Sequence, residues 1–392
     1  MDKHAKKTSL PHYPVLIVFT LFFVGLFALD LITPDRAYSE MENTTLSQRP
    51  ALTQLSAKGL NSYFTAYTKY VKDQVFGRDQ WISLQSMVET TLLQKEQNGG
   101  ILLGREHMMF PRTFGLLSSE ERTLPKNTSA VESLCQRYPG KVNVLLAPAA
   151  SDIYPENVPA NAPLLDENTY LDQLSAAVQA AGGRFVDVRG TLTDHKGEYL
   201  YYRTDHHWTS LAARYAFETL SAQLDLQPVR SYTVYPVSDS FEGTLAAKTG
   251  SHAALDTIEI YVPDTDVQYA VTYADTQTTI CSLYDRAKLA EKNQYEVFFG
   301  GNHARVDIQT TADTGRTLLL LKDSYANCFV QFLTPYYDRI LMIDPRYFYD
   351  DLGALLRRER VTDALILYNY NTFVQDHALS VVLQSALFDE GE

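Results

Sequence analysis

An uninterrupted apolar stretch near the N-terminus is the first feature of the chain. Residues 15–29 contain one polar side chain, Thr20, and two further apolar residues follow Asp30. This run of roughly 18 residues is at the lower end of what crosses a bilayer as a helix. No polar residues recur at helical spacing, so the run lacks the two-faced pattern of a core helix. The pattern predicts a membrane-spanning signal anchor over residues 14–33.

The charges around this stretch indicate its orientation. The first seven residues hold three lysines and one aspartate, and no basic residue immediately follows the apolar run. Because basic flanks stay in the cytoplasm, we expect residues 1–13 to be a cytoplasmic tail and the chain beyond Pro34 to be extracytoplasmic. The alternative is a cleaved signal peptide, although no A-x-A-like cleavage site follows the run.

Residues 34–98 are predicted to be a stalk followed by a helical segment. Residues 34–60 are polar and irregular, whereas residues 61–97 carry apolar side chains at three- and four-residue steps. This spacing predicts two helices separated at Gly77-Arg78. We expect the aromatic stripe of the first helix to pack in a core. The stripe contains Tyr63, Phe64, Tyr67, Tyr70, Val71 and Val75.

The main domain is predicted over residues 99–392, where apolar strands and helices alternate. Strict alternation predicts an α/β fold with a doubly wound parallel sheet. The expected strands are 142–148, 185–188, 317–321, 339–343 and 364–367, and the expected helices are 129–138, 171–181, 210–224, 351–357, 374–387 and one starting at Ser324.

Residues 230–300 depart from this alternation. They contain four short strand-like runs with no long helix between them, so we interpret them as an inserted β-rich segment. The runs are 232–237, 257–262, 267–273 and 295–299.

The net charge and the cysteine content argue against a nucleic-acid-binding protein and against a disulfide-rich fold. The net charge of −13 argues against a nucleic-acid partner, because a phosphate-binding surface needs a basic face. The three cysteines have no C-x-x-C spacing and are too few for a disulfide framework, so we expect buried free thiols.

Two distant stretches hold the candidate chemistry. The first is Asp205-His206-His207-Trp208, and the second is an apolar strand that runs through Leu321 towards Ser324. A carboxylate, an imidazole and a hydroxyl are the parts of a serine-nucleophile enzyme. Residues at i and i+2 of an extended segment share one side, so Asp205 is expected to face the same way as His207, with His206 facing away.

Topology predicts where further site residues lie. Ligands bind beyond the carboxyl ends of strands in such sheets, and Ser324, Arg346 and Tyr368 each follow one of them. Each residue also has a purely structural interpretation. Ser324 or Asp205 can cap a helix, the histidines can be ordinary surface or core residues, and Trp208 is expected to pack.

Three ordered blocks resemble those of a known family. Asp205-His206-His207-Trp208, residues 322–327 (KDSYAN) and residues 299–303 (FGGNH) are similar to the recurring blocks of the bacterial DHHW proteins. The resemblance runs from about Arg49 to the C-terminus. That family is similar in turn to the SGNH-hydrolase-like alginate O-acetyltransferases, which implies an SGNH-hydrolase-like fold.

The resemblance also implies a function. It assigns Asp205, His207 and Ser324 as a triad that forms an acyl-serine, with the acyl group passing to a polysaccharide hydroxyl. Expected oxyanion or substrate contacts are Tyr325, Gly301, Asn302, Asn327, Arg346 and Tyr368. We expect no metal and no cofactor, and the resemblance implies a multi-pass membrane O-acyltransferase as the acetyl donor. Lys322 replaces the usual glycine before Asp-Ser, and no carbohydrate-binding module is expected after the last helix.

Other functions stay open from the sequence. The same triad with water as acceptor would make an esterase or deacetylase, and a non-catalytic cell-surface protein can retain the fold. Asp-His-His also occurs as a manganese-binding triplet in the DHH phosphoesterases, but the early Asp-x-Asp strand of those enzymes is missing here.

The predicted topology can be tested by protease protection. If residues 15–29 span the membrane with the N-terminus inside, protease added to intact protoplasts should remove everything beyond Pro34. Immunodetection of the C-terminal half measures the loss, with a cytoplasmic protein as the control. A protected main domain would rule out an extracytoplasmic substrate.

Overall fold

The structure is a computed structural model that describes residues 13–39, 44–53, 59–112, 115–227 and 230–387. The chain divides into two compact units, Met1–Gln85 and Ser86–Glu392. The division predicted from the sequence, into a stalk up to residue 98 and a main domain from residue 99, stays a prediction.

The first unit contains the predicted apolar helix. Helix α1 (Pro14–Ile32) is long and apolar enough to cross a membrane, with a mean hydropathy of 2.7 and no buried residue. Its passage through a membrane stays a prediction. The basic N-terminal tail lies outside the described residues. A short hairpin of β1 (Tyr38–Ser39) and β2 (Thr44–Thr45) follows.

The aromatic stripe predicted to lie in a core is exposed. Helix α3 (Leu60–Gln74) has no buried residue, and the exposed fractions of Phe64 and Val71 are 56% and 41%. The prediction was wrong because helical spacing shows only that a helix has an apolar face. It does not show what covers that face. Helix α4 (Arg78–Met87) and a short π-helix (Val88–Leu92) follow.

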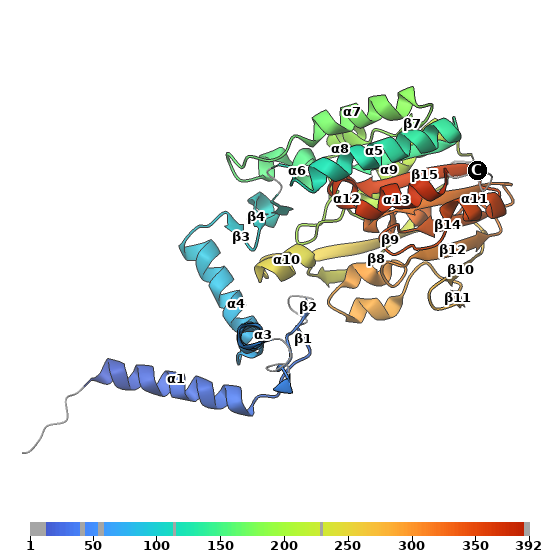
Figure 1. Cartoon of the computed structure of the whole chain (residues 1–392). Helices are drawn as coiled ribbons and strands as arrows, with labels where there is room; N and C mark the ends of the chain where they lie inside the picture. The colour runs from blue at the N-terminus through green and yellow to red at the C-terminus, as the bar shows by residue number, and fades with distance from the viewer. Residues whose placement is uncertain (1–12, 40–43, 54–58, 113–114, 228–229, 388–392) are drawn as a thin grey trace, which may run out of the picture. The chain divides into compact units, whose positions relative to one another are not determined.

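The second unit is built on an eight-stranded sheet with the order β11-β10-β12-β14-β13-β15-β6-β7 (Figure 1). Strands β14, β13, β15, β6 and β7 are parallel to one another, whereas β12, β10 and β11 are added antiparallel beyond β14. Their bounds are β6 Val142–Ala147, β7 Arg184–Phe185, β10 Tyr269–Tyr273, β11 Thr278–Ile280, β12 Arg305–Thr310, β13 Thr317–Lys322, β14 Arg339–Ile343 and β15 Asp363–Asn369.

The sheet is therefore mixed: five of its strands form the parallel sheet that was predicted, and three antiparallel strands extend it beyond β14. Strands β10 and β11 lie within the segment predicted as a β-rich insertion, and β12 lies just after it. A turn of four residues joins β10 to β11, and so short a connection can join only antiparallel neighbours. The rest of that segment forms a separate two-stranded ladder, β8 (Tyr232–Phe241) with β9 (Asp256–Pro263).

Helices cover both faces of the parallel part of the sheet. Side chains of β13 alternate between two apolar cores: Leu318 and Leu320 enter one, and Leu319 and Leu321 enter the other. Helices α8 (Arg189–Asp194) and α9 (Ser210–Leu224) contribute to the first core, and the second core takes side chains from α5 (Glu120–Arg137), α7 (Glu167–Ala180), α11 (Leu352–Glu359), α12 (Tyr370–Gln375) and α13 (His377–Ser385).

Several predicted elements differ in detail. The helix expected from Ser324 is a pair of 3₁₀ turns, Ser324–Ala326 and Val330–Phe332, and the strand expected at 295–299 is a 3₁₀ turn, Gln294–Val297. The last predicted helix is broken at Asp376, whose carboxylate caps α13. The smaller elements are β3 Gln97–Asn98, β4 Ile101–Leu103, β5 Met109–Pro111, α6 Ala150–Ile153 and α10 Thr244–Thr249.

The cysteines agree with the expectation of free thiols, but only in part with that of burial. Cys135 and Cys328 are buried, whereas Cys281, directly after β11, is exposed. No disulfide joins the three cysteines, all of which the structure describes.

Candidate active site

The segment that holds the two histidines is a bent loop and not an extended strand. A bridge between Tyr201 and Trp208 closes the loop, and the buried carboxylate of Asp256 on β9 holds it in shape. Asp256 accepts hydrogen bonds from the Arg203 N–H at 2.9 Å and from the Thr204 N–H and hydroxyl at 2.8 and 2.5 Å. The β8–β9 ladder therefore positions the loop.

Ser324 lies on the turn that follows β13. The preceding residue, Asp323, is fully buried and joins this turn to the end of β15. One carboxylate oxygen accepts the Tyr325 N–H and the other accepts the Asn369 N–H, both at 2.9 Å. Ser324 is thereby held at the carboxyl edge of two central parallel strands.

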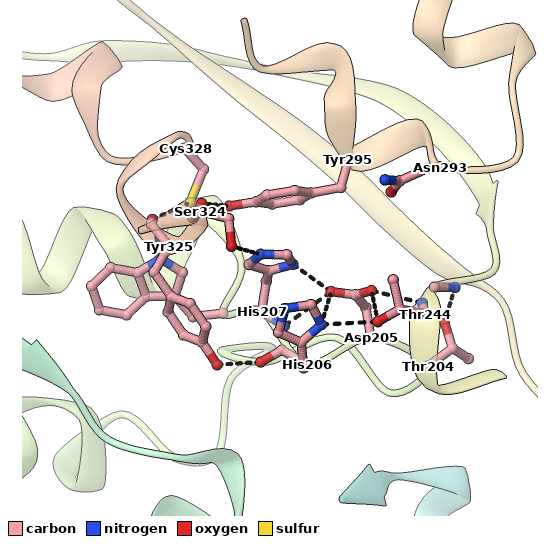
Figure 2. A network of polar contacts seen from close by, with 12 residues as sticks. Thr204, Asp205, His206, His207, Thr244, Asn293, Tyr295, Ser324, Tyr325 and Cys328 are labelled. Carbon is pink, nitrogen blue, oxygen red and sulfur yellow. Dashed lines mark hydrogen bonds and ion pairs between the residues drawn. The ribbon is translucent and has the colours of Figure 1, made fainter. Parts of the chain in front are cut away.

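Asp205, His207 and Ser324 form a continuous line of hydrogen bonds (Figure 2). The Asp205 carboxylate is 2.5 Å from His207 Nδ1, and His207 Nε2 is 2.7 Å from the Ser324 hydroxyl oxygen. The second oxygen of Asp205 accepts the N–H and the hydroxyl of Thr244 on α10, at 2.8 and 2.9 Å. This arrangement leaves the Ser324 proton facing a ring nitrogen that can take it.

The charge state of Asp205 is set by its donors. The carboxylate is buried, which by itself raises its pKa, but the adjacent His206 and His207 and the donated hydrogen bonds hold the pKa well below its usual range. Asp205 is therefore ionised at any pH near neutral. A buried anion next to His207 stabilises the imidazolium that forms when the ring accepts a proton.

Aromatic side chains connect the two segments of the site. The Tyr295 ring stacks on His207, with centroids 3.9 Å apart and planes 12° apart, and its hydroxyl donates to the Ser324 carbonyl at 3.0 Å. Trp208 is fully buried and donates from Nε1 to the Tyr325 carbonyl at 2.9 Å. The packing role predicted for Trp208 is confirmed. Sequence reasoning missed Tyr295 because nothing in its local pattern distinguishes it from a core tyrosine.

The two histidines do not face opposite ways as predicted. Their ring centroids are 3.9 Å apart, because the loop bends between them and the alternation of an extended strand is lost. The ligand atoms of Asp205, His206 and His207 lie within 4.8 Å of one another, close enough to hold a metal ion. The directions of these side chains are therefore compatible with the manganese alternative.

Two of the predicted oxyanion contacts, Asn302 and Asn327, bind a buried lysine. Lys322 Nζ donates at 2.9 Å to the side-chain oxygens of Asn302 and Asn327, and lies 3.5 Å from the Asp344 carboxylate. An ammonium group can only donate, so both amides must turn their oxygens towards it. The Asn302 oxygen also accepts from Asn327 Nδ2 at 3.2 Å, which fixes the Gly301-Asn302 turn beside the Ser324 turn.

Three other predicted contacts are engaged elsewhere. The Tyr325 N–H donates to Asp323, and its hydroxyl donates to the His206 carbonyl. The guanidinium of Arg346 binds both oxygens of Asp344, at 2.8 and 2.6 Å. Tyr368 is fully buried, and its hydroxyl donates to Asp376, so a substrate role for Tyr368 is not supported. Its place at a strand end was right, but its side chain points into the core.

A cavity of about 610 Å³ adjoins the site on the side of Asp205 and His206. Its volume is in the range of small-molecule sites, which is roughly 300–1,000 Å³. Residues from β5, α6, the start of α7 and the loop before it, α10 and α12 line it, among them Met109, Ser151, Glu167, Lys248, Asn371 and Gln375.

The sequence pattern of the family described as DHHW protein matches residues 130–343, which is more than half of the chain. A probable alginate O-acetylase, AlgJ of Pseudomonas fluorescens, is 26% identical over 238 residues, which cover 57% of this chain and 59% of that protein. The chain spans between 43% and 59% of the length of the curated relatives it matches.

Two solved structures share the fold. A DHHW family protein from Eubacterium siraeum superposes with a TM-score of 0.60 at 21% identity, over 75% of this chain and 98% of the other. PatB1 of Bacillus cereus superposes with a TM-score of 0.55 at 14% identity, over 71% of this chain and 98% of that one. At these identities the likeness extends to the architecture alone.

The tight packing around Asp205 gives a testable prediction. A Cβ atom added at Gly243 would lie 2.2 Å from Asp205 Cβ and 2.6 Å from its carboxylate oxygen, so Gly243→Ala must displace the carboxylate. A displacement of this size should lower turnover of an acetyl ester by about 10²-fold. Gly190→Ala is the control, because a Cβ there meets nothing within 4 Å. Equal activity of both variants would show that the position of Asp205 does not limit turnover.

Proposed function

The chain belongs to the DHHW protein family, and from the geometry of its site we propose that it is a membrane-anchored, extracytoplasmic O-acetyltransferase. It acts on a cell-surface or exported polysaccharide through an acyl-serine intermediate. The observation that carries the proposal is the line from the buried Asp205 through His207 to the Ser324 hydroxyl. The relationship to probable alginate O-acetylases supports acyl transfer to a sugar as the reaction class.

In the first half-reaction, Ser324 Oγ attacks the carbonyl carbon of the acyl donor. His207 Nε2 takes the serine proton while the new O–C bond forms, and it returns that proton to the leaving group as the old bond breaks. Asp205 accepts from His207 Nδ1, which fixes the tautomer in which Nε2 is the base. The products are the acyl-serine and the protonated leaving group.

In the second half-reaction, a sugar hydroxyl attacks the acyl-serine. His207 takes the hydroxyl proton, the acyl group moves to the sugar oxygen, and Ser324 recovers its proton from His207. The negative charge on the tetrahedral carbonyl oxygen needs donors in both halves. The Ser324 N–H is the first candidate, because it donates to no acceptor in the part of the chain that the structure describes.

The Gly301-Asn302 turn supplies the second candidate donor. Lys322 and Asn327 both donate to the Asn302 oxygen, so the Nδ2 group of that amide is directed away from them. Lys322 stands where the resemblance to the SGNH-hydrolase-like family implies glycine, and in this proposal it orients the turn through its hydrogen bonds to Asn302 and Asn327. Burial lowers the pKa of Lys322, while the nearby Asp344 opposes that shift.

Helix α1 supports the proposed location. A single apolar helix of 19 residues is enough to anchor the protein in the membrane, with the second unit carried outside. There it would meet an acyl donor delivered through the bilayer by a multi-pass membrane O-acyltransferase. That partner, like the polysaccharide acceptor, is part of the proposal.

Loss of the proposed base tests the mechanism. His207→Ala should lower turnover of an acetyl ester by roughly 10³-fold or more, as for other triad bases. His195→Ala is a matched control, because that histidine lies on the surface at the end of α8 and pairs with Glu198. The measurement is 4-nitrophenyl acetate hydrolysis by the full chain at neutral pH.

The same assay distinguishes a metal enzyme from a serine enzyme. The proposal requires that EDTA leave turnover unchanged, and that a fluorophosphonate label Ser324 in the wild type but not in Ser324→Ala. If EDTA removes activity and Mn²⁺ restores it, the Asp205-His206-His207 cluster is a metal site. A protein that neither turns over the ester nor takes the label would be a non-catalytic member of its fold.

Transfer and hydrolysis are distinguished by their products. We expect the enzyme to give acetylated oligosaccharide, because a sugar held near the acyl-serine has the advantage of proximity over bulk water. Mass spectrometry should show the gain of one acetyl group, dependent on Ser324. If oligosaccharides across a broad panel only lose acetyl groups, the protein is a deacetylase with the same triad.

A further inference from the structure

The hydrogen bonds of His206 fix which of its ring nitrogens carries the proton. Thr244 has one hydroxyl proton and donates it to the Asp205 carboxylate. The same hydroxyl oxygen is 2.9 Å from His206 Nδ1, and an Asp205 oxygen is 3.5 Å from that nitrogen. Both neighbours of Nδ1 are therefore acceptors, so Nδ1 must hold the proton and donate it.

The other ring nitrogen of His206 is consequently an acceptor. Partial removal from water and the neighbouring His207 lower the pKa of His206, although Asp205 opposes this, so the ring is neutral near pH 7. In the neutral ring, Nε2 carries a lone pair. The side chain is 38% exposed and lines the cavity beside the site, with its Nδ1 edge turned towards Asp205 and Thr244 (Figure 2). Nε2 lies on the edge that these two residues leave open.

The other wall of the cavity carries groups suited to hydroxyls. Glu167 is buried next to Asp152, and its burial, together with the charge of Asp152, raises its pKa to about 8, so its carboxyl group is largely protonated near neutral pH. The side-chain oxygen of Asn371 accepts no hydrogen bond within the described part of the chain, but this atom is itself buried and not open to a ligand. Polar side chains that line the cavity, among them Ser151, Lys248 and Gln375, match an alcohol together with the imidazole acceptor of His206, because an alcohol both donates and accepts.

We propose that this cavity is the acceptor subsite, in which Nε2 of His206 accepts a hydrogen bond from a sugar hydroxyl next to the one that receives the acyl group. The inference rests on the proposed function, because it identifies this cavity as the binding site for the sugar of the second half-reaction. The His206 ring lies against the His207 ring, so a sugar bound through His206 presents its neighbouring hydroxyl to the catalytic base. His207 takes the reacting proton, and His206 holds the sugar.

The partition of the acyl-serine between sugar and water tests the assignment. The full chain is supplied with 4-nitrophenyl acetate, with a short alginate oligosaccharide or cellotetraose as acceptor, and the ratio of acetylated sugar to free acetate is measured. Because both products arise from one intermediate, damage to the first half-reaction cancels in this ratio. His206→Phe keeps a ring and loses the acceptor, so its ratio should fall at least tenfold. His206→Gln places an amide oxygen near the same point, so its ratio should stay within about threefold of the wild type.

The outcomes separate this inference from the proposed function. An unchanged ratio in His206→Phe, with a thermal unfolding midpoint like that of the wild type, overturns the role of His206. If the wild type acetylates neither sugar, transferase function fails, and calorimetry of Ser324→Ala with the same two sugars then tests the subsite. Binding that is weakened at least tenfold in Ser324→Ala with His206→Phe supports the subsite. Binding of neither sugar, or binding indifferent to His206, overturns it.

Discussion

The buried carboxylate of Asp205 is the constraint around which the site is arranged. A buried charge is tolerated only when each of its lone pairs has a donor. Two residues supply those donors: His207 from the same loop, and Thr244 through its N–H and its hydroxyl. Gly243 is small because the carboxylate leaves no room for a side chain. Removing any one donor would leave the buried carboxylate partly unsatisfied. The positions of the loop, of helix α10 and of the His207 ring therefore depend on one another.

The site combines residues of the central sheet with residues of the inserted segment 230–300. Ser324 belongs to the central sheet, where Asp323 joins the ends of β13 and β15. The supports of His207 come largely from residues 230–300: Asp256 on β9, Thr244 on α10, and Tyr295. The proposed nucleophile is thus part of the core fold, while the proposed base is held in place largely by the insertion. In this arrangement, changes in the insertion can alter the acceptor without moving the serine.

The sequence was sufficient to predict those elements whose structure depends on the local pattern of apolar residues. The strands Val142–Ala147 and Arg339–Ile343 could be predicted because parallel strands buried on both faces appear as continuous apolar runs. Helix Ser210–Leu224 could be predicted from its spacing. The placement of Ser324 at a strand end followed from topology, and the structure places it there.

Features that depend on distant segments could not be predicted. The antiparallel strands at the sheet edge, the stacking of Tyr295 on His207 and the contact of Thr244 with Asp205 all depend on how the insertion folds back. The bend that brings the rings of His206 and His207 together depends on Asp256, about fifty residues away. Tyr368 was wrongly predicted to contact substrate, because topology places a residue at the end of a strand but does not give the direction of its side chain.

The central claim is that Ser324 carries the acyl group between donor and acceptor. Rapid quenching after mixing with 4-nitrophenyl acetate, followed by tryptic digestion and mass spectrometry, tests it most directly. We predict one acetyl group on residues 323–339, located on Ser324, and its disappearance when a sugar acceptor is added. Consumption of the ester with that peptide unmodified, or with the acetyl group on another residue, would contradict the account.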